Sequence, residues 1–233
     1  MKRNILFLSW LIVLGVLFSA NLANFYFQTG NYYFGDGGYN LVKAEKYYQK
    51  AREINPELAR LNYQIARLHF IKGNFYEAIW SINKELQFYP DYPRSYYVRG
   101  LIYGYQGNLD KSIEDFKKFL EWKPESWAWR NDLAWVYFQK GDIEAVEREA
   151  RLGLDYNPDN PWLSNIYGVA LLNMGRKEEA KKALQSSLYN FERIGQKGWG
   201  AAYPGNDPRI YKKGYEETLS AIKENLALTE NHL

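Results

Sequence analysis

Apolar and polar positions alternate along this chain with the period of an α-helix, and the pattern restarts every 34 residues. In residues 57–72 apolar side chains recur at spacings of three and four, and the pattern resumes after Gly73 and Asn74 with Ala78, Ile79, Ile82 and Leu86. The restart is marked by two series at the same interval: Gly73, Gly107, Gly141 and Gly175, and Pro56, Pro90, Pro124 and Pro158. Each 34-residue unit therefore predicts a helix, a tight turn and a second helix.

The two series have separate physical roles. Glycine accepts the left-handed conformation that a helix C-terminus requires, so each glycine ends the first helix of its unit. Proline lacks an amide hydrogen and disfavours helix in the residue before it, so each proline follows the second helix. A third series holds only small residues, which predicts a close approach of the two helices in each unit: Ala66, Gly100, Ala134 and Gly168.

With these positions fixed, the unit resembles the tetratricopeptide repeat. The residues that match its signature are Tyr96, Gly100, Tyr103, Leu133, Ala134 and Tyr137 on first helices and Ala78, Phe116 and Ala180 on second helices. Glu85, Phe119 and Val146 depart from it, since the family usually has small residues there. The match covers residues 59–194, as four repeats. The resemblance implies an all-α, right-handed helical solenoid of four to five repeats with a C-terminal capping helix.

Upstream of these repeats, residues 28–58 form a degenerate first repeat. Its second helix is well supported by Ala44, Tyr48 and Ala51. Its first helix would fall in a segment with four glycines, which disfavour helix. We expect a short or irregular first element there, or one that continues from the preceding segment.

The N-terminal segment is apolar and uncharged over residues 5–27, preceded by Lys2 and Arg3. Its 23 residues suffice to cross a bilayer as a helix, which predicts a transmembrane anchor over residues 1–27. The charge distribution places the N-terminus in the cytoplasm and the repeats outside it. The alternative is secretion after signal cleavage, although Phe18 and Asn21 fit the cleavage rule poorly.

The composition argues against most chemistry. The chain has no cysteine, and a net charge of +3 leaves no basic field for binding nucleic acid. His69 and His232 have no partner ligands at metal-binding spacing, and no nucleophile elbow or phosphate loop is present. We expect no enzyme activity, no cofactor and no metal site.

The last part of the chain divides into two segments. Residues 195–207 are rich in glycine and contain Trp199 and Tyr203, which predicts a loop that packs as a lid or contacts a partner. Residues 208–233 predict a capping helix that begins at Pro208 and covers the last apolar face of the solenoid.

The family resemblance also implies a binding groove, lined by the second, fifth and ninth residues of each repeat. In this register the candidate groove residues are Arg60, Tyr63, Arg67, Arg94, Tyr97, Asn131, Trp135, Trp162 and Asn165. Arginine and tyrosine are common anchors at protein interfaces, and asparagine can hold a peptide backbone.

The leading hypothesis is therefore a membrane-tethered scaffold that binds a peptide or protein segment in the concave groove. Two alternatives remain. The first is a glycan- or cell-wall-binding module that uses Tyr63, Tyr97, Trp135 and Trp162 as stacking platforms. The second is an accessory subunit of a membrane enzyme complex.

Overall fold

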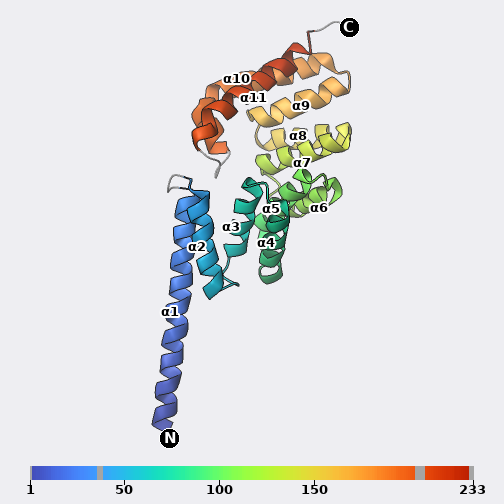
Figure 1. Ribbon diagram of the computed structural model, residues 1–233. Coiled ribbons are helices and arrows are strands. Elements are labelled where there is room, and N and C mark those ends of the chain that lie inside the picture. Colours follow the sequence, from blue (N-terminus) through green and yellow to red (C-terminus); the bar gives the residue numbers. More distant parts are fainter. Residues whose placement is uncertain (1, 36–38, 203–207, 231–233) are drawn as a thin grey trace. The chain divides into compact units, whose positions relative to one another are not determined.

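The computed structural model describes residues 2–35, 39–202 and 208–230, with residues 2–14, 16 and 208 as backbone alone. In these ranges the chain forms eleven α-helices and one short 3₁₀ helix, without a β-strand. The helices are α1 (Lys2–Phe34), α2 (Leu41–Ile54), α3 (Leu61–Ile71), α4 (Phe75–Phe88), α5 (Pro93–Tyr105), α6 (Leu109–Leu120), α7 (Trp127–Lys140), α8 (Ile143–Tyr156), α9 (Pro161–Asn173), α10 (Lys177–Ala202) and α11 (Tyr211–Ala227). The predicted all-helical, repeat-built fold is confirmed (Figure 1).

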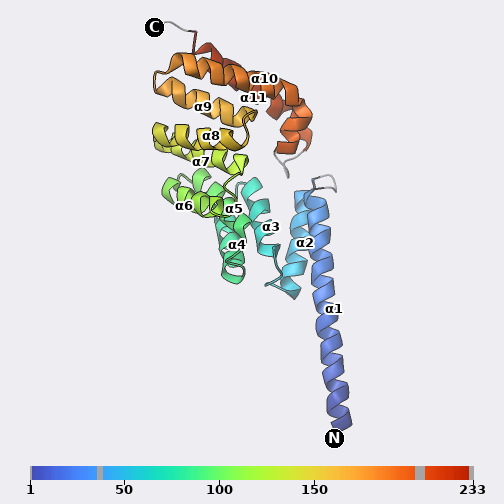
Figure 2. The ribbon, with the colours of Figure 1, turned by 180° about the vertical axis from the view of Figure 1, so that it is seen from behind.

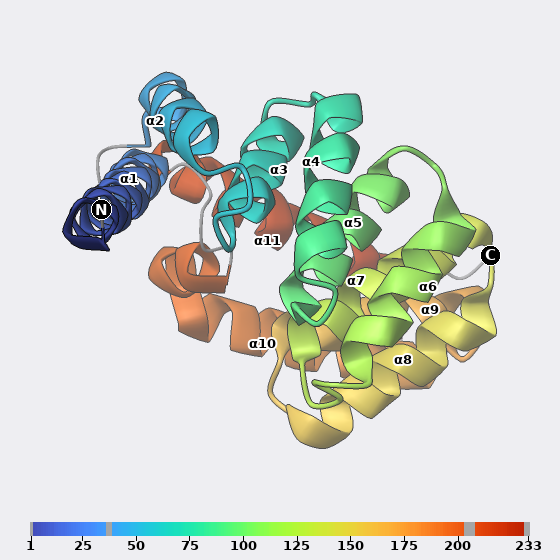
Figure 3. The same ribbon diagram turned by 90° about the horizontal axis from the view of Figure 1, so that it is seen from below.

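Two compact units divide the chain within α5: Met1–Val98 and Arg99–Leu233, called here the N-unit and the C-unit. In the N-unit, α1 packs along α2, and α3 packs along α4 (Figure 3). In the C-unit, α7 packs along α8, α9 along α10, and α10 along α11 (Figure 2). Each unit is thus assembled from neighbouring helices, as a repeat protein is.

The N-terminal helix continues beyond the predicted anchor and ends at Phe34. Ala23, Phe27 and Phe34 are buried, and the rings of Phe27 and Phe34 lie against Tyr48 of α2. Gly30 allows this packing, since a Cβ there would lie 2.5 Å from the Tyr48 ring. The first element is therefore not short or irregular: it continues from the preceding segment, the second of the two expectations, as a regular helix that completes the first helix pair.

This packing corrects the prediction of a membrane anchor over residues 1–27. Across the residues that the structure describes, no helix combines the length and apolar character needed to cross a membrane. The predicted single-pass topology, with a cytoplasmic N-terminus and extracytoplasmic repeats, is contradicted by this finding. The physical reason lies in the second half of the segment, where Ala23 and Phe27 face α2.

The four periodic glycines all adopt left-handed backbone angles, with φ of 75°, 77°, 80° and 75° along the chain. Each is followed by the same hydrogen bond: the amide of the next residue donates to the carbonyl five residues back, as from Asn74 to His69 at 2.9 Å. This is the Schellman arrangement, which satisfies the last carbonyls of a helix and reverses the chain. The left-handed glycine and this backbone hydrogen bond therefore fix the turn between paired helices.

The small residues bring the paired helices close together. Ala66 and Ala134 are fully buried, and Gly100 and Gly168 are buried as well. A Cβ on Gly168 would lie 2.5 Å from Cγ of Leu184, which is nearer than packed carbon atoms approach. Glycine at this position therefore allows α9 and α10 to pack closely against each other.

Buried ion pairs add polar links inside the C-unit. Arg130 donates to the carbonyl of Pro124 at 2.9 Å and to the carboxylate of Glu149 at 2.8 Å. The side chains of Arg130 and Glu149 are only 11% and 10% exposed, so each charge depends on the other for its partner. The link joins α7 both to α8 and to the proline that follows α6.

The C-terminal segments differ from the prediction of a loop over residues 195–207. Helix α10 is interrupted at Gly195, where φ is 61° and ψ is −173°, and then continues as helix to Ala202. Trp199 is buried, and its indole nitrogen donates to the Thr218 hydroxyl of α11 at 3.1 Å. Residues 203–207, including Tyr203, lie outside the described residues. The described part of this segment packs against α11.

Helix α11 covers the end of the C-unit. Its Ile222 is buried, and the ring of Tyr215 stacks on Phe191 of α10 with centroids 5.0 Å apart. The helix begins at Tyr211 after the 3₁₀ turn of Pro208–Ile210, three residues later than the sequence predicts. The apolar surface that α10 would otherwise expose is thus buried.

Candidate functional site

The candidate groove residues lie in both units, and those of the N-unit come together around two tyrosine rings. The rings of Tyr63 and Tyr92 meet edge to face with centroids 5.2 Å apart. The guanidinium of Arg60 lies 5.8 Å from the Tyr92 ring centre, and that of Arg67 lies 5.8 Å from the Tyr63 ring centre. Burial raises the pKa of the Tyr63 hydroxyl, and the nearby charges of Arg67 and Arg94 oppose that shift. We call these five residues the arginine–tyrosine cluster.

The backbone beneath the cluster is fixed by Glu85 of α4. Arg60 has φ of 68°, an uncommon left-handed conformation for a residue other than glycine. The Glu85 carboxylate accepts hydrogen bonds from the amides of Arg60 at 2.8 Å and Tyr63 at 3.2 Å. It thereby satisfies free amides at the start of α3, and its burial raises the pKa of the Glu85 carboxyl. Glu85 therefore holds the entry of α3 and orients Arg60.

Arg67 is positioned by contacts with the first helix pair. Its guanidinium donates to Gln64 at 2.8 Å and lies 5.0 Å from the ring centre of Phe34. Gln64 in turn donates to Asn31 of α1 at 2.9 Å, and Asn31 also accepts from the Tyr48 hydroxyl. This chain of contacts fixes Arg67 through α1, so α1 is part of the site's support.

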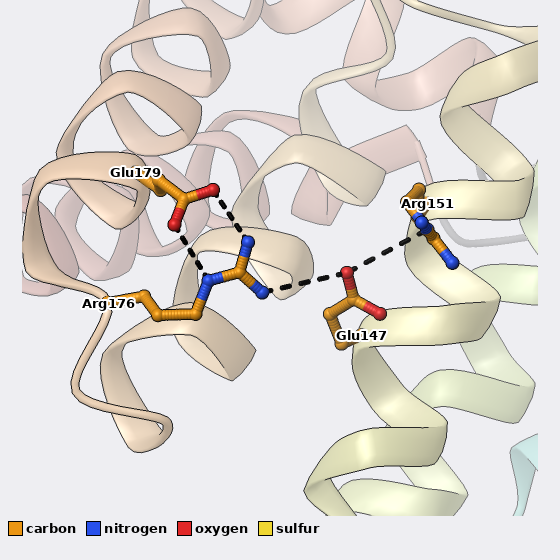
Figure 4. Close-up of polar contacts among 4 residues, drawn as sticks. All are labelled: Glu147, Arg151, Arg176 and Glu179. Carbon is orange, nitrogen blue, oxygen red and sulfur yellow. Dashed lines mark hydrogen bonds and ion pairs between the residues drawn. The ribbon is translucent and has the colours of Figure 1, made fainter.

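Charge pairing differs between the arginines of the two units. In the C-unit, arginines pair with carboxylates within 4.0 Å: Arg99, Arg130, Arg148, Arg151, Arg176 and Arg193. Figure 4 shows one such network, in which Arg176 binds Glu179 and also reaches Glu147. Within the described part of the N-unit, Arg60 contacts an aromatic ring and Arg67 contacts aromatic rings and an amide, and neither they nor Arg94 forms an ion pair with a carboxylate side chain.

The candidate groove residues of the C-unit are engaged in internal contacts. Trp135 packs against Tyr105 with ring centroids 5.2 Å apart. Trp162 stacks on Trp127 at 5.1 Å and meets Phe191 edge to face at 5.9 Å. Asn131 is half-buried on α7. The tryptophans therefore contribute to the packing between repeats as well as to the surface.

Asn165 makes a contact that the sequence did not predict. Its side-chain oxygen accepts a hydrogen bond from Asn225 of α11 at 3.1 Å. The terminal helix thus occupies one of the positions assigned to the groove. A link between residues 60 positions apart leaves no periodic signal in the sequence.

An open depression of about 590 Å³ lies beside the tryptophan stack, between the α8–α9 turn and the end of α10. Its lining is mainly aromatic and proline side chains with small residues of α10: Trp127, Tyr156, Pro158, Pro161, Trp162, Gly198, Ala201 and Ala202. Asp159 is the charged residue in this lining, and it pairs with Arg193 at 3.4 Å. The depression is open and of mixed polarity, since Asn157 and Asn160 also line it.

The structure therefore brings together Arg60, Tyr63, Arg67 and Arg94, while Tyr97 lies half-buried on the same unit. Tyr63 is only 8% exposed, so its ring face is not available as a platform for a sugar. Sequence reasoning missed Tyr92, which belongs to the cluster, and Glu85, which fixes the backbone beneath it. Glu85 departs from the repeat pattern as a charged residue at a small-residue position, and that departure was the available signal.

Comparison with models of known families finds the same repeat. A tetratricopeptide repeat model matches residues 93–126 and 164–190. The chain contains tetratricopeptide repeats. No curated protein matches its sequence.

Solved structures with the same fold share little sequence. PilW, described as a widely conserved type IV pilus biogenesis factor, superposes with a TM-score of 0.66 at 16% identity, over 90% of this chain and 98% of that one. MamA superposes with a TM-score of 0.64 at 17% identity, over 74% of this chain and 93% of that one. A thermophilic repeat protein of Thermus thermophilus gives 0.59 at 18% identity, over 85% and 99%. These likenesses establish a tetratricopeptide-type helical solenoid.

Proposed function

We propose that this protein is an interaction scaffold that binds a segment of another protein on the first-helix faces of its repeats. The observation that carries the proposal is the arginine–tyrosine cluster, in which cationic side chains are held over aromatic rings at the positions that the repeat pattern assigns to binding. Arginine and tyrosine supply much of the binding energy at protein interfaces. Tetratricopeptide repeats present such a surface without requiring a catalytic group.

The rigidity of the cluster supports this role. Glu85 fixes the backbone at Arg60 and Tyr63, and the contacts through Gln64 and Asn31 fix Arg67. Side chains that are ordered before binding lose less conformational entropy when a partner arrives. The cluster is thus preorganised for recognition.

Photo-crosslinking tests the proposal. A benzophenone side chain is placed at Tyr97 in one variant, at Trp135 in a second, and at the exposed Lys117 of α6 as control. We expect one protein to be captured from Tyr97 or Trp135 and not from Lys117, and to bind the purified chain directly. Equal capture from all three positions, or direct binding unchanged by Tyr97→Ala and Arg94→Ala together, would contradict it.

A further inference from the structure

We infer that the arginine–tyrosine cluster of the N-unit selects an acidic partner: an extended peptide segment whose Asp or Glu side chains meet Arg60 and Arg94. This inference rests on the proposed function and names the partner class for the same site. It follows from the charges around the cluster, from the exposure of its guanidinium groups and from the way they are held.

The charges around the cluster are unbalanced. Three guanidinium groups surround the Tyr63 and Tyr92 rings, and the carboxylate packed beneath them is that of Glu85. Both Glu85 oxygens already accept backbone amides, so this carboxylate offers little further bonding to the guanidinium groups. In the described part of the N-unit no Asp or Glu side chain forms an ion pair with these arginines, in contrast to the paired arginines of the C-unit (Figure 4).

The exposure of the guanidinium groups allows a partner to reach them. Arg60 and Arg94 are exposed, while Arg67 is half-buried beneath them. The Arg60 guanidinium lies over the Tyr92 ring and keeps its N–H edges free, because a ring contacts the flat face of a guanidinium. Those edges are the groups that bind a carboxylate through two parallel hydrogen bonds.

These features together fit an acidic segment better than a neutral one. Clusters of arginine are a recurrent way to recognise acidic and phosphorylated motifs. A neutral peptide would leave two of the three positive charges without a compensating carboxylate as water is excluded around them, which is costly. A basic peptide would add repulsion.

Arg52 offers a matched control in the same unit. Its guanidinium also lies over an aromatic ring, 5.8 Å from the centre of Trp80, and forms no ion pair with a described carboxylate. Arg52 lines a separate small cavity beside His69 and is not part of the cluster. Arg52→Gln therefore removes one positive charge from the N-unit without altering the proposed site.

The test is a selection of binding peptides from a random twelve-residue library, amidated at the C-terminus, on the full chain and on two variants. The wild-type chain and Arg52→Gln should both select peptides enriched in Asp and Glu. Arg60→Gln with Arg94→Gln should lose that enrichment. A selected peptide, labelled for fluorescence anisotropy, should bind at least 10-fold more weakly once its acidic residues are changed to Asn and Gln, and at least 10-fold more weakly to the double variant. Circular dichroism checks that the double variant folds.

The outcomes separate this inference from the proposed function. Peptides selected without acidic enrichment, with binding lost in Tyr97→Ala, would leave the scaffold function standing and overturn the acidic preference. Selection of no peptide would overturn both. Binding of a labelled oligothymidylate in place of any peptide, lost in the same double variant, would assign the cluster to nucleic acid and overturn the inference.

Discussion

Arg99 of α5 forms two hydrogen bonds, both 2.8 Å long, with the carboxylate of Asp115 on α6. The Asp115 side chain is 5% exposed and that of Arg99 is 23% exposed, so the pair is largely removed from water. Bidentate geometry compensates part of the desolvation cost of both charges. The pair joins the two helices of one repeat, as the Arg130–Glu149 pair does in the next repeat.

Removing one partner of this pair should destabilise the fold. We expect Asp115→Ala to lower the free energy of unfolding by about 2–3 kcal/mol, because it leaves a partly buried guanidinium without its partner. Urea denaturation measures the change. Asp110→Ala is the control, since the Lys140–Asp110 pair has side chains 45% and 85% exposed and should contribute much less to stability. Equal effects of the two substitutions would contradict the assigned role of burial.

Adding a methyl group at Gly168 should force α9 and α10 apart. The new Cβ would lie 2.5 Å from Cγ of Leu184, a side chain that is fully buried and has no free space to move into. The strain of overpacking, about 1–3 kcal/mol, should exceed the helix propensity gained from alanine, about 1 kcal/mol. Urea denaturation should therefore show a net loss for Gly168→Ala. In a Leu184→Ala background the loss should largely disappear, and its persistence there would show another cause.

The left-handed turn at Gly107 supplies a test that leaves the first-helix faces intact. Its φ is 77°, which is unfavourable for a β-branched residue. Gly107→Val should lower stability by about 1–2 kcal/mol or more, whereas Gly107→Asn should cost clearly less, since asparagine tolerates this conformation. Thermal unfolding followed by circular dichroism distinguishes the two. Equal melting temperatures for valine, asparagine and wild type would refute the turn assignment.

The free energy of unfolding should depend on pH through His69. Burial lowers the pKa of the His69 imidazole, and its Nδ1 is buried without a hydrogen-bond partner in the described structure. Because the folded-state pKa lies below the unfolded value, the unfolded chain binds the proton more readily. The stability that His69 contributes is present above the unfolded pKa and is lost as the pH falls towards the folded pKa.

The corresponding substitution is His69→Tyr, since Tyr103 and Tyr137 occupy the equivalent places in the next two repeats. Urea denaturation of wild type and variant is compared at pH 7.5 and pH 5. We expect the wild-type chain to lose more stability on acidification than the variant. An equal loss in both proteins would place the pH dependence in other groups.

Much of the repeat architecture could be predicted from residues 34 positions apart. The turn at Gly107 and the close approach at Gly168 each need one residue type at one place, and such local requirements are visible in a single sequence. The groove positions were implied by the family resemblance in this register, which says which residues share a face but not what each side chain contacts. Asn165 shows the difference, because its partner Asn225 belongs to a helix outside the repeat pattern.

The sequence by itself thus determined the helix pairs, their turns and the residue types along the first-helix faces, because backbone conformation and helical periodicity are local properties. The tertiary structure decided the rest. It showed that Phe27 packs on α2, that Trp199 is buried under α11, and that Glu85 supports Arg60. It also decided which arginines have a carboxylate partner, since ion pairing depends on side chains brought together from separate helices, and the repeat period does not encode those distances.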